Sequence, residues 1–239
     1  MTELLNFTPA EIAALYLSIK VAFCSTLVIV MPGILVAWLL VRKTFFGKSL
    51  VDALVHMPLV LPPVVPGFLL LVLLGNQGLI GKYLNEHWGI SIAFTWLGAA
   101  VASAVMAFPL MVSATKLAIS QVDAKLEVAA QSLGAHPLRV FFTITLPLAS
   151  PGILTGLILS FSRSLGEFGA TITFVGNIEG ETRTLPLAIY TYIQTPESDF
   201  PAMRLVILSM VIALGALMSS AILQRKAMRS LGRDSKNEQ

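Results

Sequence analysis

Long apolar runs alternate with short polar segments along this chain. Four of the runs contain no charged residue, and a fifth is interrupted only by Arg163 and Glu167. Each run is close to the roughly 20 residues that a helix needs to cross the hydrocarbon core of a bilayer. The pattern predicts an all-α integral membrane protein with a single domain, 1–239. Its five transmembrane helices are expected at about 13–41, 51–75, 90–115, 148–174 and 202–223.

The composition agrees with a membrane protein and argues against a soluble domain. Hydrophobic residues make up 56% of the chain and charged residues only 12%, against about 25% charged in soluble domains. A cleaved signal peptide is the rival explanation of the first run. The acidic residues Glu3 and Glu11 precede that run, and neither a basic segment nor a small-residue cleavage site accompanies it, so a retained span is favoured.

The distribution of cations predicts how the helices are oriented. Short loops rich in lysine and arginine stay in the cytoplasm, and the first connection, the third connection and the tail are all basic, whereas the fourth connection is acidic. We expect the N-terminus outside and the C-terminus inside. The net charge of +3 is then mostly a topology signal, and we expect no nucleic-acid partner. The cations expected inside are Arg42, Lys43, Lys48, Lys116, Lys125, Arg139, Arg225, Lys226, Arg229, Arg233 and Lys236.

Prolines are concentrated in the second apolar run. Each internal proline removes a backbone hydrogen bond and clashes with the preceding turn, so this helix is expected to be broken or strongly kinked. Broken backbone at membrane depth is tolerated where it is enclosed by protein or lines a water-filled cavity. Pro62, Pro63 and Pro66 are therefore candidates for lining a pathway or gate, and a kink that serves only packing is an equally open alternative.

The segment 120–147, between the third and fourth runs, has the pattern of two short helices. Asp123 is an expected N-cap, Gly134 an expected left-handed helix end, and Pro137 can open a second helix at its first position. One interpretation is a cytoplasmic helix that a soluble partner grips. An amphipathic helix that rests on lipid headgroups is the alternative.

This segment also resembles a known family. The run VAAQSLG, followed after nine residues by ITLP, is similar to the E-A-A-x3-G-x9-I-x-L-P loop of ABC importer permeases. The resemblance implies a type I permease fold whose coupling helix docks on a cytoplasmic ATPase. The family's glutamate aligns with Val128, and Glu127 stands one place earlier. The implied coupling residues are Glu127, Ala129, Ala130, Gly134, Pro137, Ile144, Leu146 and Pro147.

A second resemblance concerns the substrate. The run SRSLGEFG at 162–169 is similar to a motif of permeases for tetrahedral oxyanions, and GATITFVGNI with GETRTLPLAIYT resembles the molybdate type. The resemblance implies a multi-pass protein of the bacterial inner membrane that imports molybdate. Sulfate or thiosulfate, and tungstate, are the alternative substrates. The implied partners are ABC ATPase subunits, an extracytoplasmic molybdate-binding protein and a second copy of the chain.

Arg163, Gly166, Glu167 and Gly169 within this motif are further candidates for the pathway or gate. Arg163 and Glu167 are four residues apart, so on a helix they share a face and can pair, which lowers the cost of burying both charges. The pair can serve the gate or only fix a helix orientation. A permanently cationic site would hold a dianion too tightly for release, so the sequence does not assign Arg163 as a substrate ligand.

The remaining chemistry of the chain points away from catalysis. His56, His87 and His136 have no cysteine or carboxylate partners at ligand spacing, and no phosphate-binding G-x-x-x-x-G-K-[ST] loop occurs. We expect no cofactor, no metal and no enzymatic activity, with ATP bound by the partner subunit. An ion-coupled secondary transporter usually needs internal repeats and intramembrane carboxylates, of which Glu167 is the only one deep in a run. A membrane enzyme would need a nucleophile next to a base.

Overall fold

The computed structural model describes residues 7–234, with side chains in the last helix described to Ile222 except at positions 217, 220 and 221. The described part is helical and contains no strand, which agrees with the expected fold class. The helices are α1 Pro9–Arg42, α2 Lys48–Val60, α3 Val64–Leu74, α4 Gly81–Trp88, α5 Trp96–Gln121, α6 Ala124–Ser132, α7 Pro137–Val140, the π-helix η2 Phe141–Thr145, α8 Leu146–Leu165, α9 Gly169–Val175, α10 Leu185–Gln194 and α11 Asp199–Asp234.

Four helical stretches are long and apolar enough to cross a membrane. They are α1, α5, the continuous stretch Pro137–Leu165 formed by α7, η2 and α8, and the first half of α11. The helices α2 and α3 pass the same test together, but they meet at an angle of 112°. This bend lies at the Pro62–Pro63 pair, so the break expected from the prolines is confirmed.

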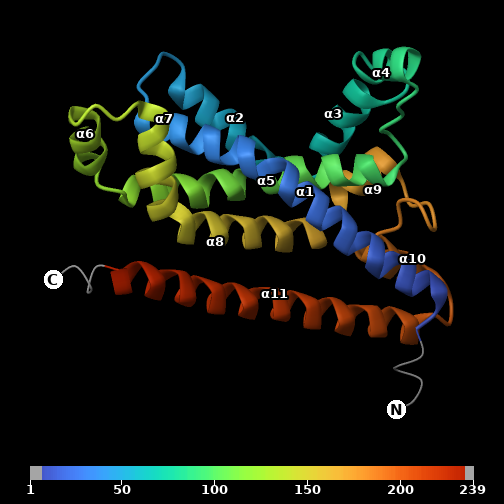
Figure 1. The fold of residues 1–239 in the computed structure, drawn as a ribbon. Coiled ribbons are helices and arrows are strands. Elements are labelled where there is room, and N and C mark those ends of the chain that lie inside the picture. The colour runs from blue at the N-terminus through green and yellow to red at the C-terminus, as the bar shows by residue number, and fades with distance from the viewer. Residues whose placement is uncertain (1–6, 235–239) are drawn as a thin grey trace.

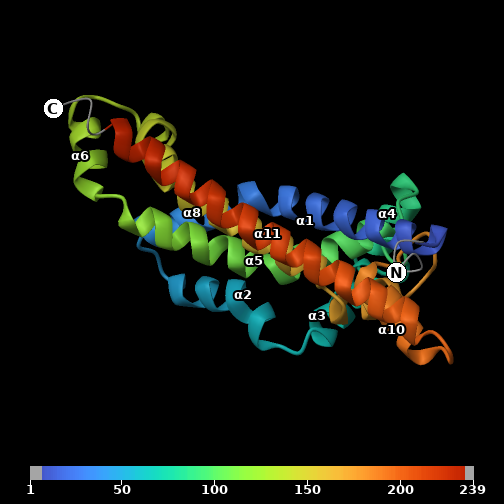
Figure 2. The same ribbon diagram turned by 90° about the horizontal axis from the view of Figure 1, so that it is seen from below.

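The helix α5 forms the centre of the bundle. It packs against α1 on one side and α8 on another, and also touches α2, α3 and α9. Its buried positions include small residues such as Ala102, Ser103 and Ala107. Small side chains allow helix backbones to approach closely where lipid provides no hydrophobic driving force. Figures 1 and 2 show the result, an elongated bundle with α6 at one end and α4 and α10 at the other.

A buried ion pair joins the N-terminal parts of α1 and α11. Arg204 of α11 contacts both carboxylate oxygens of Glu11 in α1, with Nη2 at 2.5 Å from Oε1 and at 2.6 Å from Oε2. Both side chains are at least nine-tenths buried. Thr8 and Glu11 also form a capping box at the start of α1. The sequence showed Glu11 only as an acidic flank, because its partner is 193 positions away.

The fourth span differs from the helix expected at 148–174. It begins earlier, because α7 runs through the π-helix η2 into α8 without a break. It also ends earlier, at Leu165. The residues Gly166–Phe168 are not helical, and the short helix α9 follows them. The third span is shifted as well, since α5 begins at Trp96 and continues to Gln121. The short helix α10 lies in the connection between α9 and α11.

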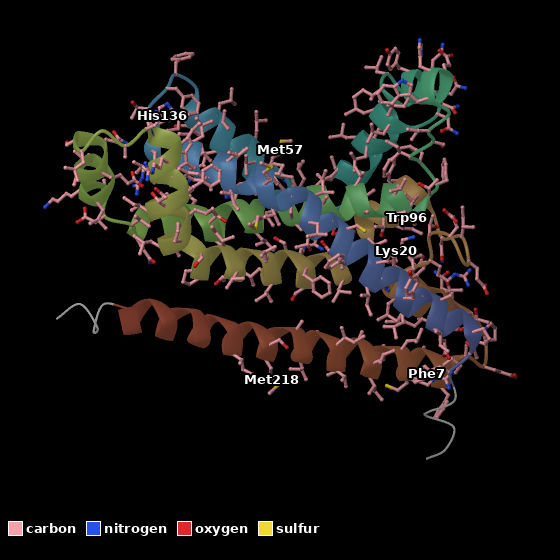
Figure 3. The ribbon with its side chains drawn as sticks, in the orientation of Figure 1. Phe7, Lys20, Met57, Trp96, His136 and Met218 are labelled. Carbon is pink, nitrogen blue, oxygen red and sulfur yellow. The ribbon has the colours of Figure 1, made fainter. Side chains whose placement is uncertain are left out.

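Lys20 and Met218 illustrate a covered and an uncovered position on the spans. Figure 3 shows Lys20 of α1 beside Trp96, at the start of α5, where the Lys20 Nζ lies 3.5 Å from the ring centroid. Such a cation–π contact offsets part of the cost of placing an ammonium group near apolar surroundings. Met218 instead projects from the side of α11 that faces away from α8 (Figure 3) and is 65% exposed. One face of α11 is therefore left uncovered within this single chain.

Candidate functional site

The helix α6 has the ends that the sequence predicts. The Asp123 carboxylate accepts a hydrogen bond from the Lys125 N–H at 2.9 Å and caps the first turn. Gly134 has a φ of +88° just beyond the last turn, a conformation that favours glycine. Pro137 occupies the first turn of α7, where its missing N–H has no cost. A short helix is thus set off from the spans by local signals at both ends.

Glu127 ties α6 to two other elements. Its carboxylate lies 2.9 Å from Arg42 Nε at the end of α1 and accepts a hydrogen bond from the Thr145 hydroxyl of η2 at 2.6 Å. Arg42 also donates to the Val122 carbonyl at 2.9 Å. The side chains of Arg42 and Glu127 are only 16% and 12% exposed. Glu127 therefore points inward and holds α6 in place.

An apolar surface covers the outer side of α6 and the start of the next helix. Val128, at the position of the family's motif glutamate, is 61% exposed, and Leu133 is 90% exposed. Ala129 is exposed and Ala130 half-buried, so the outer side of α6 is open beside small side chains. We call this the α6 surface. It consists of Val128, Ala129, Leu133, Leu138 and Phe142.

The other predicted coupling residues lie on the helix that leads back into the bundle. Ile144 and Leu146 are half-buried and Pro147 is exposed, and all three belong to the continuous helix of η2 and α8. A cavity of about 750 Å³ lies between α5 and α8, and none of these three residues belongs to its wall. Its wall includes Asp123 and Leu126 at the base of α6. The α6 segment is thus joined to the inside of the bundle through α8.

The breaks in the second and fourth apolar runs meet in one pocket. We call it the break pocket. It has a volume of about 370 Å³, and it brings together residues that the sequence proposed separately for the pathway. Two proposed residues lie outside its wall: Pro62 is exposed, and Pro66 is buried within α3. The lining residues are Pro63, Val64, Arg163, Gly166, Glu167, Phe168, Gly169 and Ile172.

Arg163 and Glu167 are paired across the end of α8. The Arg163 Nη1 lies 2.7 Å from Glu167 Oε2, and the Glu167 side chain is 1% exposed while that of Arg163 is 28% exposed. The other Glu167 oxygen accepts a hydrogen bond from the Ala170 N–H at 2.7 Å. The expected pairing is confirmed, but the two residues do not share one helix, because α8 ends between them.

Two glycines let the broken segments approach closely. A Cβ atom on Gly169 would lie 2.6 Å from the Pro63 Cβ, and one on Gly67 would lie 2.6 Å from the Ala170 carbonyl oxygen. Both distances are far below an ordinary contact. The helices α3 and α9 are thus packed backbone against backbone beside the break pocket. The sequence showed the GEFG motif and the PPVVPG run but not that they touch.

A polar cluster between α2 and α5 escaped the sequence analysis. The Asp52 carboxylate of α2 lies 2.7 and 2.8 Å from the Lys116 ammonium of α5. His56, one turn after Asp52, has its Nε2 2.8 Å from the Ser113 hydroxyl. No residue of α2 is fully buried, and these polar contacts add to the packing of Val51 and Val55 of α2 against the core. The expectation that His56 has no carboxylate partner was wrong, since its Nδ1 lies 3.4 Å from Asp52 Oδ1, and the four-residue spacing of the two was the available signal.

Within residues 7–234, no group of three or more histidine, cysteine, aspartate or glutamate side chains is arranged to hold a metal ion. The free thiol of Cys24 lies half-buried in α1. The described residues have a protruding apolar surface at one end and a pocket at the helix breaks.

Comparison with known proteins gives the family. A family model described as "Binding-protein-dependent transport system inner membrane component" matches residues 29–229, which include the α6 segment and the break pocket. The chain belongs to this family. It is a multi-pass inner membrane component of a transport system. The fold class expected from the sequence, an all-helical permease, is confirmed.

Curated relatives cover almost the entire membrane component. The chain is 54% identical to "Molybdenum transport system permease protein ModB" of Haemophilus influenzae over 93% of its length and 97% of the relative. It is 56% identical to the protein of the same name from Escherichia coli, over 95% of its length and 99% of the relative. Identity to the E. coli "Sulfate transport system permease protein CysT" is 36%, over 90% of this chain and 76% of that one.

Solved structures share the fold of this membrane component. One is a bacterial ABC transporter involved in the import of the acidic polysaccharide alginate, with a TM-score of 0.73 and 18% identity over 92% of this chain and 80% of that chain. Another is the MetNI methionine ABC transporter in inward-facing conformations, with a TM-score of 0.68 and 16% identity over 90% and 95% of the two chains. At these identities the likeness concerns the fold alone.

Proposed function

We propose that this chain is the permease subunit of an ABC importer that moves molybdate into the cytoplasm. The observation that carries the proposal is the 54–56% identity, over nearly the full length of both chains, to permeases named for molybdenum transport. The sulfate permease is a weaker match at 36% identity. The proposal also agrees with the break pocket, where an oxyanion-permease motif meets a second broken span.

The energy is proposed to come from a partner ATPase. The chain has no phosphate-binding loop in its sequence, and it presents the apolar α6 surface outside the bundle. An apolar patch of this kind is typical of a docking site for another protein. In the proposed cycle, two ATPase subunits close on ATP and pull two α6 segments together, and hydrolysis resets them. Glu127 transmits this movement to α1 and η2 through Arg42 and Thr145.

The transporting unit is proposed to be a homodimer that receives molybdate from an extracytoplasmic binding protein. Five spans are few for enclosing a pathway, and one face of α11 is uncovered. The uncovered face is available to lipid or to a second copy. The α6 end would face the cytoplasm and the α4 and α10 end the outside, as the basic loops favour. The binding protein would then dock near α10.

Cellular molybdenum tests the proposal. We expect cells that lack this chain to lose most of their molybdenum when they grow at trace molybdate, and we expect the intact gene to restore it. Elemental analysis makes the measurement, and excess sulfate or tungstate in the medium tests selectivity. Little competition by sulfate supports molybdate as substrate. Unchanged molybdenum together with impaired sulfate uptake would refute molybdate and favour the sulfate alternative.

A further inference from the structure

The Arg163 guanidinium has N–H donors without an acceptor where it lines the break pocket. The Arg163 Nη1 lies 2.7 Å from Glu167 Oε2. The guanidinium has no second polar partner among the residues that the structure describes. A guanidinium carries five N–H donors. Arg163 and Glu167 are the two polar side chains in a wall of otherwise apolar residues and glycines. Unused donors in such a pocket are available to an acceptor that enters it.

The buried carboxylate of Glu167 changes what Arg163 can hold. The pair has no net charge, and the Ala170 N–H fixes the carboxylate in place. An arginine alone would bind a dianion strongly, which would hinder release. Next to the Glu167 carboxylate, the same guanidinium still donates charge-assisted hydrogen bonds, while the nearby negative charge weakens the attraction. The geometry therefore suits a site that an oxyanion occupies and leaves.

We infer that the break pocket is a transient subsite for a tetrahedral oxyanion, contacted by Arg163 and moderated by Glu167. The inference rests on the proposed function, since it names the residues that touch the transported anion. Irregular backbone at membrane depth is expected where it lines a cavity, and the pocket is formed at two such breaks. The small volume of about 370 Å³ is in the range of small-molecule sites.

A purely structural ion pair is the competing explanation, and a double-mutant cycle separates the two. If the pair only stabilises the fold, replacing both charges together should restore what a single replacement loses, because the uncompensated buried charge is removed. If Arg163 contacts the anion, the double replacement should still fail. The cycle needs Arg163→Gln, Glu167→Gln and Arg163→Gln/Glu167→Gln, and Arg163→Lys is added as the conservative variant.

The experiment uses the complete complex of permease, ATPase and binding protein in proteoliposomes, with molybdate as the transported ion. We expect Arg163→Gln/Glu167→Gln to lower molybdate uptake per ATP hydrolysed by roughly tenfold or more, the effect of losing a hydrogen bond to a charged group. ATP hydrolysis stimulated by the loaded binding protein should persist. Arg163→Lys should retain part of the uptake. The matched control is Lys82→Gln/Glu86→Gln, an exposed pair of the same spacing on α4.

Binding is also measured without transport. A cysteine at Val64 in a Cys24→Ala background lies in the wall of the break pocket, and we expect molybdate or sulfate to slow its reaction with a maleimide. The double replacement of Arg163 and Glu167 should abolish that protection.

Two results would overturn the proposed subsite. One is wild-type uptake per ATP in the double variant, and the other is a rate of maleimide labelling at position 64 that neither molybdate nor sulfate changes. A wild-type complex that transports no molybdate would instead refute the proposed function.

Discussion

Gly134 shows how a single residue can matter without making a contact. Its φ is +88°, and a Cβ atom placed there would meet nothing within 4 Å. A substitution would therefore cost backbone strain and no clash. The left-handed conformation costs other L-residues roughly 1–2 kcal/mol, with asparagine among the better tolerated. The strain would fall on the turn that separates α6 from α7.

Replacing Gly134 with valine should uncouple transport from ATP hydrolysis. The strained turn would shift α6 relative to α7, so ATPase movement would reach the spans poorly. We expect uptake per ATP to fall severalfold at equal membrane abundance. Gly134→Asn is the control, and it should stay close to wild type. Unchanged coupling in Gly134→Val would contradict the role proposed for this helix end.

Of the predictions made from single residues and their neighbours, some were confirmed and one was wrong. The end signals of α6 were correct because capping and left-handed glycines depend on a few neighbouring residues. The pairing of Arg163 with Glu167 was also correct. The assumption behind it, a helix through both, was wrong because α8 ends at Leu165. A carboxylate just beyond a helix end still reaches a side chain in its last turn.

At the scale of elements, the Glu127 carboxylate makes the side-chain polar contacts of α6 with α1 and η2. Glu127 contacts Arg42, 85 positions away, and Thr145, 18 positions away. The α6 surface itself is exposed. The motif position of the resemblance falls on Val128, which points outward, while the acidic residue one place earlier points inward. The shift by one residue thus places Val128 on the exposed α6 surface and Glu127 at the contact with Arg42 and Thr145.

Replacing Glu127 with alanine should loosen α6 without unfolding the spans. Thr145 would lose its partner and Arg42 would keep only the Val122 carbonyl, at a cost of roughly 1–3 kcal/mol for an unsatisfied buried group. We expect amide hydrogen exchange in α6 to rise on the order of tenfold, and uptake per ATP to fall. Exchange in α5 should not change. Glu86→Ala, an exposed carboxylate on α4, serves as control. Wild-type exchange in α6 would rule out the anchoring role.

At the scale of the whole molecule, the α6 surface and the helices α4 and α10 lie at opposite ends of the elongated bundle (Figures 1 and 2). The break pocket lies away from α6, where α3 meets α9. In the proposed complex, an ATPase bound at the α6 end would act on the pocket through long helices such as α8. The orientation of the bundle in the membrane is thus central to the mechanism.

Cysteine labelling tests that orientation. In a Cys24→Ala background, we expect Leu79→Cys to react with an impermeant maleimide on spheroplasts, because the loop before α4 should face outward. Phe46→Cys, in the basic loop after α1, should react only after permeabilisation. Both native side chains are more than four-fifths exposed, so access to them is not limited by the protein. The reverse pattern would overturn the proposed orientation.

The sequence by itself determined the all-helical membrane class, the break in the second span and the ends of α6. These features depend on the length of apolar runs and on residues a few positions apart. Only the tertiary structure decided that Glu11 pairs with Arg204, that Glu127 is held by Arg42, and that Pro63 meets Gly169 in one pocket. Such contacts join positions far apart in the chain, so they follow from how the helices pack and not from any local pattern.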